Sequence, residues 1–281
     1  MASSVNSQRV AFKKQMTSTI CVSSTRREVS DGVNFAVALA RVTGWLLHVD
    51  WWVPSLDPDN NVPLEDCKPL RVYVADNGSR IFDVRGNRSL GDFIHRTIRP
   101  IAVRHGMGGV RTRYYAESAL ATLPLRCAPD PAKINSAAKA IEANTAYLAS
   151  IPKRLAPCVP AAEAAVYTFG RCAAFAEAMR VLTGLDPVAL LAIRFEPGAE
   201  GTEHGADGYV HSFVLHPDGM GEDSWGKVDV REIAQRFGVV EFRLSREAHG
   251  RVVNNLQRNS PELYETAFAK ANELIQTYRQ Q

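Results

Sequence analysis

Apolar positions in the second half of the chain follow first a helical spacing and then a strand spacing. Residues 172–183 carry apolar side chains every three or four positions, which predicts a helix that Gly184 ends. Further apolar segments, of strand or helix length, follow at 189–195, 209–215, 230–237 and 239–244. A short strand carrying Asp223 is expected after the second of these. The pattern predicts an α+β lobe, in which one helix precedes an antiparallel meander.

The first half of the chain repeats this pattern at a constant distance of 140 residues, as positions 32 and 172 illustrate. Identical residues fall in three blocks in the same order: Phe35 and Phe175, Ala36 and Ala176, Ala38 and Ala178, Thr43 and Thr183, Gly44 and Gly184, Val74 and Val214, Asp83 and Asp223, Gly86 and Gly226. Because the offset does not change, we expect an internal duplication with pseudo-twofold symmetry. Two unrelated α+β domains with a similar rhythm of elements are the alternative.

In the first copy, residues 90–95 and 101–104 are expected to match the later helix and the closing strand. The basic, glycine-rich stretch 104–114 is interpreted as a flexible surface loop. Proline residues flank an alanine-rich segment between the lobes, which favours a connecting helix there. An apolar stripe over 261–279 predicts a final helix packed on the body. The expected organisation is a leader 1–28, a lobe 29–128, a connecting segment 129–164 and a second lobe 165–281.

Composition limits the classes of function. Hydrophobic residues make up 46% and charged residues 22% of 281 residues, and the net charge is +3, which is typical of a globular protein without a dense nucleic-acid-binding face. No apolar run reaches the roughly 18 residues of a membrane span. The cysteines form no CxxC pair, which argues against a disulfide framework or a zinc knuckle and favours a reducing compartment: Cys21, Cys67, Cys127, Cys158 and Cys172.

The leader is basic and serine-rich, and it has no acidic residue before Glu28. It also lacks the apolar centre of a secretory signal peptide. Two interpretations stay open: a disordered tail, or an export or targeting segment such as a type III secretion signal or a transit peptide. The expected location is therefore the cytoplasm, or outside it by export without a classical signal peptide, as for a secreted effector.

Three residues of the second lobe have the chemistry of a thiol catalytic site. Cys172 begins the predicted helix, where free N–H groups and the helix dipole lower a thiol pKa and are suited to hold an oxyanion. His211, on a predicted strand, is suited to take the thiol proton, and Asp223, on the next strand, to orient the imidazole. The neighbouring Asp218 and Glu222 are alternatives to Asp223, and Cys172 as a small core residue is the alternative to catalysis.

These residues also form a motif that resembles the core of the transglutaminase-like superfamily: Gly170-x-Cys172-x-x-Phe175-Ala176, His211-x-Phe213-Val214 and Asp223, within residues 165–245. In that superfamily, and in the wider papain-like fold, such residues form a Cys–His–Asp triad. The resemblance implies thiol acyl transfer on a protein or peptide amide or an ester, with no cofactor or metal. The chain departs from the family in that Trp225 follows the Asp, and Thr168 and Gln257 are the candidates for an oxyanion donor.

The first copy lacks this chemistry, because Gly32 stands where Cys172 is and Arg71 where His211 is, while Asp83 is retained. We therefore expect a scaffold or substrate-binding lobe, with Asp83 pairing with Arg71. Two further hypotheses are a catalytically inactive two-lobed protein-binding module and a metal-dependent hydrolase around His204, His211 and His216. Substrate and oligomeric state are left open by the sequence.

Overall fold

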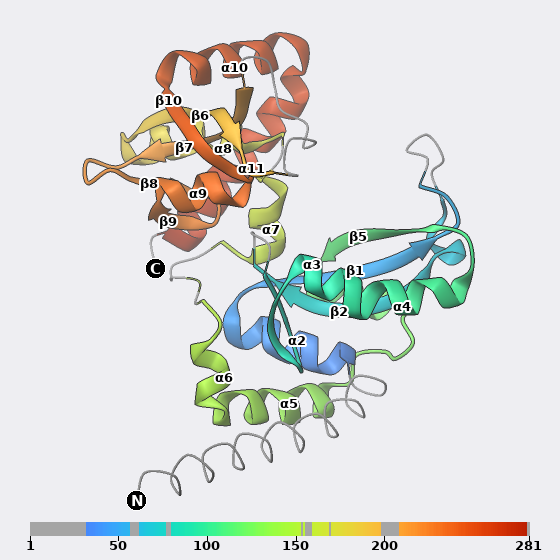
Figure 1. The fold of residues 1–281 in the computed structure, drawn as a ribbon. Helices are drawn as coiled ribbons and strands as arrows, with labels where there is room; N and C mark the ends of the chain where they lie inside the picture. Colours follow the sequence, from blue (N-terminus) through green and yellow to red (C-terminus); the bar gives the residue numbers. More distant parts are fainter. Residues whose placement is uncertain are drawn as a thin grey trace, which may run out of the picture. The chain divides into compact units, whose positions relative to one another are not determined.

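Each half of the chain folds into a five-stranded antiparallel sheet that follows a helix (Figure 1). The computed structural model describes residues 32–56, 62–76, 80–152, 154, 159–168, 170–197 and 208–279. The chain divides between Lys153 and Arg154 into two compact units, called here the N-terminal and the C-terminal unit. The expected α+β class is confirmed, whereas the leader 1–28 lies outside the described residues.

The C-terminal unit begins with a short helix and the helix that carries Cys172. Its elements are α7 (Ala161–Val166), α8 (Cys172–Thr183), β6 (Asp186–Phe195), β7 (Tyr209–Leu215), β8 (Met220–Asp223), β9 (Gly226–Asp229), α9 (Val230–Arg236), β10 (Val239–Ser245), α10 (Arg246–Asn259) and α11 (Pro261–Arg279). The strand order in the sheet is β10-β6-β7-β8-β9. The predicted helices over 172–183 and 261–279 are confirmed, whereas α10 was not predicted, because its sequence is mostly polar.

Apolar residues hold α8 and α9 against this sheet. Phe213, Ile233 and Phe237 belong to one core cluster in which α9 packs on the strands. On α8, the face between Phe175 and Met179 is buried, and α11 packs along it through the buried side chains Tyr264, Ala267, Ala271, Leu274 and Ile275. The position of Cys172 at the start of α8 is therefore fixed by burial along the first two turns of the helix.

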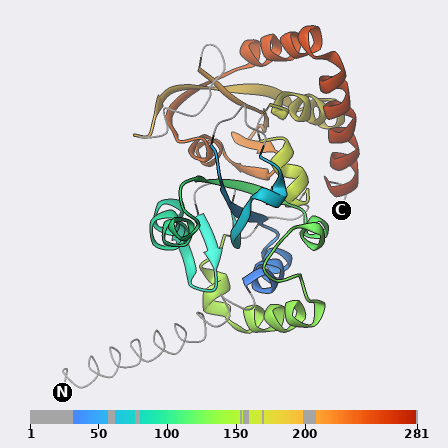
Figure 2. The ribbon, with the colours of Figure 1, turned by 90° about the vertical axis from the view of Figure 1, so that its right-hand side faces the viewer.

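The N-terminal unit has a matching series of elements. They are α2 (Gly32–Thr43), β1 (Leu46–Val53), β2 (Lys68–Ala75), β3 (Arg80–Asp83), β4 (Gly86–Ser89), α3 (Leu90–Phe93), a π-helical turn (Ile94–Ile98), α4 (Arg99–Ala102), β5 (Gly109–Tyr115), α5 (Pro131–Ala143) and α6 (Thr145–Ala149). The strand order is β4-β3-β2-β1-β5. Helix α5 packs along α2 through Ile134 and Ile141, so that α2 is covered within its own unit (Figures 1 and 2).

The two sheets agree in strand order and, near the site, in register. Leu47 pairs with Val74, and Pro187 pairs with Val214. The register shifts directly after Asp50 in the first sheet and directly after Leu190 in the second. Positions 50 and 190 are 140 residues apart, which is also the offset between the similar segments in the sequence.

Two expectations for residues 101–114 are wrong. Residues 101 and 102 end α4, and the closing strand is β5, Gly109–Tyr115, so that this stretch is not a flexible loop. The glycines there allow close packing: a Cβ on Gly108 would lie 2.4 Å from the Val53 carbonyl oxygen, and one on Gly109 2.2 Å from the Leu56 side chain. Glycine in this stretch therefore indicates close packing against the backbone of Val53 and the side chain of Leu56.

The segment 129–164 is shared between the units: α5 and α6 belong to the N-terminal unit and α7 to the C-terminal unit. None of the described helices has the length and apolar character that crossing a membrane requires.

Candidate active site

Cys172 is the first residue of the 12-residue helix α8. Gly170, two residues earlier, has a φ of 76°, a left-handed conformation that suits glycine and turns the chain into the helix. The first helical hydrogen bond runs from the Phe175 N–H to the Arg171 carbonyl. The N–H groups of the first turn therefore point out of the helix start on which the thiol lies. Only 4% of Cys172 is exposed.

His211 lies in β7, opposite Leu190 of β6, and it is almost completely buried. Its Nε2 donates to Oδ2 of Asp223 over 3.0 Å, and its ring centroid lies 4.9 Å from that of Phe237. Within the described part of the chain, Nδ1 of His211 is buried and makes no hydrogen bond of ordinary geometry. One ring nitrogen is thus fixed by a carboxylate, and the other stays available for proton transfer.

Asp223 ends β8 and holds three donors. Its Oδ1 accepts from the Trp225 backbone N–H at 2.9 Å, and its Oδ2 accepts from His211 and from Nη1 of Arg236 at 2.7 Å. Burial alone would raise the pKa of this carboxyl, but the charges and hydrogen bonds of Arg236 and His211 hold it far below its ordinary value. Asp223 is therefore a carboxylate at neutral pH.

The alternatives to Asp223 point elsewhere. Asp218 pairs with Lys227 over 2.6 Å, and Glu222 pairs with His216 over 2.7 Å and also with Arg279. The carboxylate that meets His211 is therefore that of Asp223.

The thiol and the imidazole favour their charged forms. Burial would raise the pKa of Cys172, but the charge of the nearby His211 and hydrogen bonds from Tyr209 and the Ser212 backbone lower it. Burial would lower the pKa of His211, but the Cys172 thiolate and Asp223 raise it to about 9. Both shifts favour a thiolate–imidazolium pair over a neutral thiol and a neutral imidazole.

No known family model, curated protein or solved structure matches this chain. What the site does therefore has to follow from its own residues.

Four polar residues that the sequence analysis did not single out form a second network at the thiol. The Tyr209 hydroxyl lies 3.2 Å from Sγ of Cys172 and 2.9 Å from Oγ of Ser212. Ser212 in turn lies 3.0 Å from Nδ1 of His249, whose Nε2 donates to Glu177 over 3.0 Å. His249 was missed because the polar segment that carries it was not predicted to be a helix. Tyr209 and Ser212 flank His211 in β7, and this proximity was the available signal.

The two oxyanion candidates from the sequence are engaged away from the thiol. Oγ1 of Thr168 accepts from the Trp225 indole N–H over 2.9 Å, and the Gln257 side chain bonds Tyr264. The donors nearest the sulfur are instead the Tyr209 hydroxyl and the Ser212 backbone N–H.

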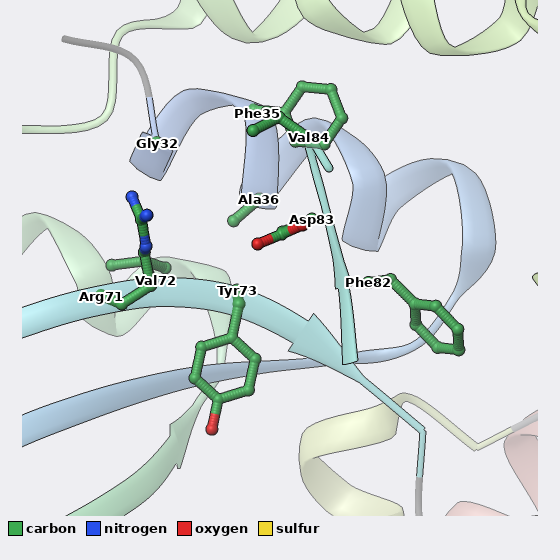
Figure 3. A pocket seen from close by; sticks show the side chains of 9 residues that line it. All are labelled: Gly32, Phe35, Ala36, Arg71, Val72, Tyr73, Phe82, Asp83 and Val84. Carbon is green, nitrogen blue, oxygen red and sulfur yellow. The ribbon is translucent and has the colours of Figure 1, made fainter. Parts of the chain in front are cut away.

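Figure 3 shows the corresponding place in the N-terminal unit, where Arg71 on β2 points toward Gly32 at the start of α2. A Cβ on Gly32 would lie 4.0 Å from Nη1 of Arg71. Asp83 forms an ion pair with Arg88, and the charge of Arg71 also acts on Asp83, so the expected pairing of Asp83 with Arg71 stays a prediction. The cavity there holds about 10 Å³, room for one water molecule at most.

The structure does not bring together the histidines of the metal hypothesis, as far as it describes them. His211 bonds Asp223, His216 bonds Glu222, and His204 lies outside the described residues. Among the residues that the structure describes, no group of three or more His, Cys, Asp or Glu side chains is placed to hold a metal ion.

Proposed function

We propose that the C-terminal unit is a thiol-dependent hydrolase or acyltransferase that acts on an amide bond of a protein or peptide. The observation that carries the proposal is the position of His211, with one nitrogen on the Asp223 carboxylate and its charge acting on the Cys172 thiol. A buried carboxylate and a raised imidazole pKa are the conditions under which a cysteine is held as a thiolate.

The reaction would proceed through a thioester. The Cys172 thiolate adds to the carbonyl carbon, and the candidate donors for the resulting oxyanion are the Tyr209 hydroxyl, the Ser212 backbone N–H and the N–H groups at the start of α8. As the tetrahedral species collapses, the His211 imidazolium gives its proton to the leaving amine. Water or a second amine then attacks the thioester carbonyl, and His211 takes a proton from this attacking group. The carbon–sulfur bond breaks, and Cys172 is released as the thiolate.

Access is the condition that this site must meet. Because only 4% of Cys172 is exposed, a carbonyl reaches the sulfur only when neighbouring groups move aside. Opening of active sites by loop motion is common among enzymes, and the rate of that opening would limit turnover.

We further propose that the two units arose by duplication and belong to the transglutaminase-like and papain-like architecture. The shared strand order, the shared register and the constant distance of 140 residues between positions such as 50 and 190 support this history. On this view the N-terminal unit has lost its nucleophile, since Gly32 and Arg71 stand in place of Cys172 and His211.

The proposal is tested by alkylation of the full chain with iodoacetamide across pH, read by peptide mass spectrometry. In the native protein Cys172 should react faster at pH 6–7 than the buried Cys67 of the same chain, and His211→Ala should abolish that advantage. A Cys172 that reacts only after unfolding, or equally fast without His211, would refute thiol catalysis.

One observation favours a binding function for the N-terminal unit as a second candidate. A cavity of about 410 Å³ is lined by basic side chains on several segments: Arg71, Arg85, Arg104, His105 and Arg126. The described residues that line it include no acidic side chain. Charge of one sign around a cavity of this size suits an acidic peptide segment. Binding of a labelled Glu-rich peptide, measured by fluorescence anisotropy, should weaken in Arg104→Met/Arg126→Met and be unchanged by Cys172→Ser. Equal affinity in both variants would refute this role.

A further inference from the structure

A continuous chain of hydrogen bonds leads from a partly buried carboxylate to the candidate nucleophile. It runs from Glu177 through Nε2 and Nδ1 of His249 to Ser212, then to Tyr209 and to Sγ of Cys172. All four separations lie between 2.9 and 3.2 Å. His249 and Ser212 are 2% and 1% exposed, so that water does not compete for the bond between them.

The first member of the chain has a fixed role. The hydrogen bond from His249 lowers the pKa of Glu177 to about 2 against the effect of burial, with further help from Arg180. Glu177 is therefore a carboxylate at neutral pH and accepts, and Nε2 of His249 must carry a proton. The imidazole of His249 can then differ only in whether Nδ1 also carries a proton.

Each hydroxyl in the chain has a single proton, so the state of Nδ1 sets the direction of every bond after it. When Nδ1 is bare, Ser212 donates to it, Tyr209 donates to Ser212, and only a lone pair of Tyr209 faces the sulfur. That arrangement favours the protonated thiol. When Nδ1 carries a proton, Ser212 accepts from it and donates to Tyr209, and the Tyr209 proton faces the sulfur. That arrangement favours the thiolate.

We propose that Glu177, His249 and Ser212 control the direction in which Tyr209 donates, and that they turn its proton toward the Cys172 thiolate when both nitrogens of His249 are protonated. The inference rests on the proposed function and adds a control to the same site. Tyr209 would contact the reacting sulfur, whereas His249, Ser212 and Glu177 are positioning residues that act through it.

Few other charged or titratable groups act on this chain among the described residues. Arg180 of α8 pairs with Glu177 from the exposed side, and Tyr264 of α11 lies within the electrostatic reach of both. On the thiol itself, His211 and Tyr209 of β7 act together. The counter-charge of His249 is thus Glu177, and removing that one charge should bias the chain toward the thiol form.

The test is the ionisation of Cys172 in the full chain, followed by thiolate ultraviolet absorbance as pH rises. The matching Cys172→Ser variant is subtracted for each protein, and this readout needs no access for a reagent. Tyr209→Phe should raise the apparent pKa of Cys172, so that its ionisation constant becomes about tenfold smaller. Hydrogen bonds to charged groups have this strength. Ser212→Ala and Glu177→Gln should shift it in the same direction.

Two matched variants control for lost hydrogen bonds in the core. Tyr167→Phe removes a buried hydroxyl that bonds the Ala267 carbonyl, and Ser224→Ala removes one that bonds the Ala164 carbonyl. Neither should move the ionisation of Cys172. A shift as large as that of the relay variants would show a general effect of packing and overturn the relay.

The decisive comparison is the pair of substitutions in one chain. If Ser212 acts through Tyr209, Ser212→Ala should add nothing in the Tyr209→Phe background. Additive shifts, or an ionisation that none of the three variants moves, would overturn the relay. Failure of the proposed function is a separate result: Cys172 alkylation that ignores His211 would refute catalysis whatever the ultraviolet titration shows.

Discussion

Arg236 and His211 donate to the same oxygen of Asp223, Oδ2, at 2.7 and 3.0 Å. The Arg236 side chain is 9% exposed and the Asp223 side chain 3% exposed, so that this is a buried ion pair. The positive charge of Arg236 keeps the Asp223 carboxylate ionised. It also balances part of the negative charge that His211 would otherwise meet on Asp223. His211 is thereby held in place by Asp223 and charged mainly by the thiolate, the first of the causes that raise its pKa.

Removing Arg236 should destabilise the C-terminal unit strongly. Arg236→Met leaves the buried Asp223 carboxylate with His211 as its remaining cationic partner, which typically costs about 3–5 kcal/mol. Hydrogen exchange of α9 and β8 peptides in urea measures the loss. Arg231→Met, an exposed arginine on the same helix, should cost less than about 0.5 kcal/mol.

The pair should also couple. Arg236→Met combined with Asp223→Asn should cost less than the sum of the two single changes, by about 1–3 kcal/mol, because the double variant has no uncompensated charge. Strict additivity would contradict a stabilising contact between the two side chains.

The pKa of His211 should depend more on Cys172 than on Asp223. It is raised to about 9 by the thiolate charge first and by the Asp223 hydrogen bond second. Cys172→Ala should therefore lower the His211 pKa further than Asp223→Asn does, in a titration of its ring protons by NMR. A raised imidazole pKa stabilises the folded state at pH values below that pKa. The free energy of unfolding that His211 contributes in the wild type should therefore be lost as pH rises through about 9. The reverse order of the two variants would contradict the thiolate–imidazolium pair.

Asp50 should make the N-terminal unit less stable at neutral than at acid pH. Burial raises its pKa to about 6, although Thr112 and Tyr73 donate to it over 2.6 and 3.1 Å. The unfolded carboxyl ionises at lower pH, so stability falls between about pH 4 and 6. Asp50→Asn keeps an acceptor for both donors and should add about 2–3 kcal/mol at pH 8 and little at pH 4, at 1.36 kcal/mol per pKa unit. Thermal unfolding measures this, and the exposed Asp66→Asn should change neither value.

Periodicity predicted the parts of the fold that bury a regular apolar face. Helix α8 and strand β7 match the predicted segments because their apolar spacing is enforced by packing on both sides. Strand β5 and helix α10 were not predicted. Strand β5 begins where Gly108 and Gly109 pack closely against Val53 and Leu56 of the same chain. Helix α10 has a polar sequence, and tertiary packing stabilises it.

The candidate site was predictable only as far as residue types and spacing carry it. Cys172, His211 and Asp223 could be named because the helix and the two strands that hold them were each expected from the sequence. Arg236, Glu177 and His249 reach the site from other elements, with His249 bonding Glu177 of α8 from α10. Contacts of this kind depend on how helices pack, which no local pattern in the sequence records.

A cysteine placed at Gly32 tests whether the N-terminal unit keeps the geometry of the candidate active site. The new Cβ would lie 4.0 Å from Nη1 of Arg71, at the start of a 12-residue helix. A fixed guanidinium and a helix start both favour a thiolate. Gly32→Cys should therefore react with iodoacetamide about tenfold faster at pH 7 than Gly91→Cys, whose Cβ would have no neighbour within 4 Å. Arg71→Met in the Gly32→Cys chain should remove most of the difference. Equal rates at the two positions would contradict the equivalence of Gly32 and Cys172, and with it the support that the N-terminal unit lends to duplication.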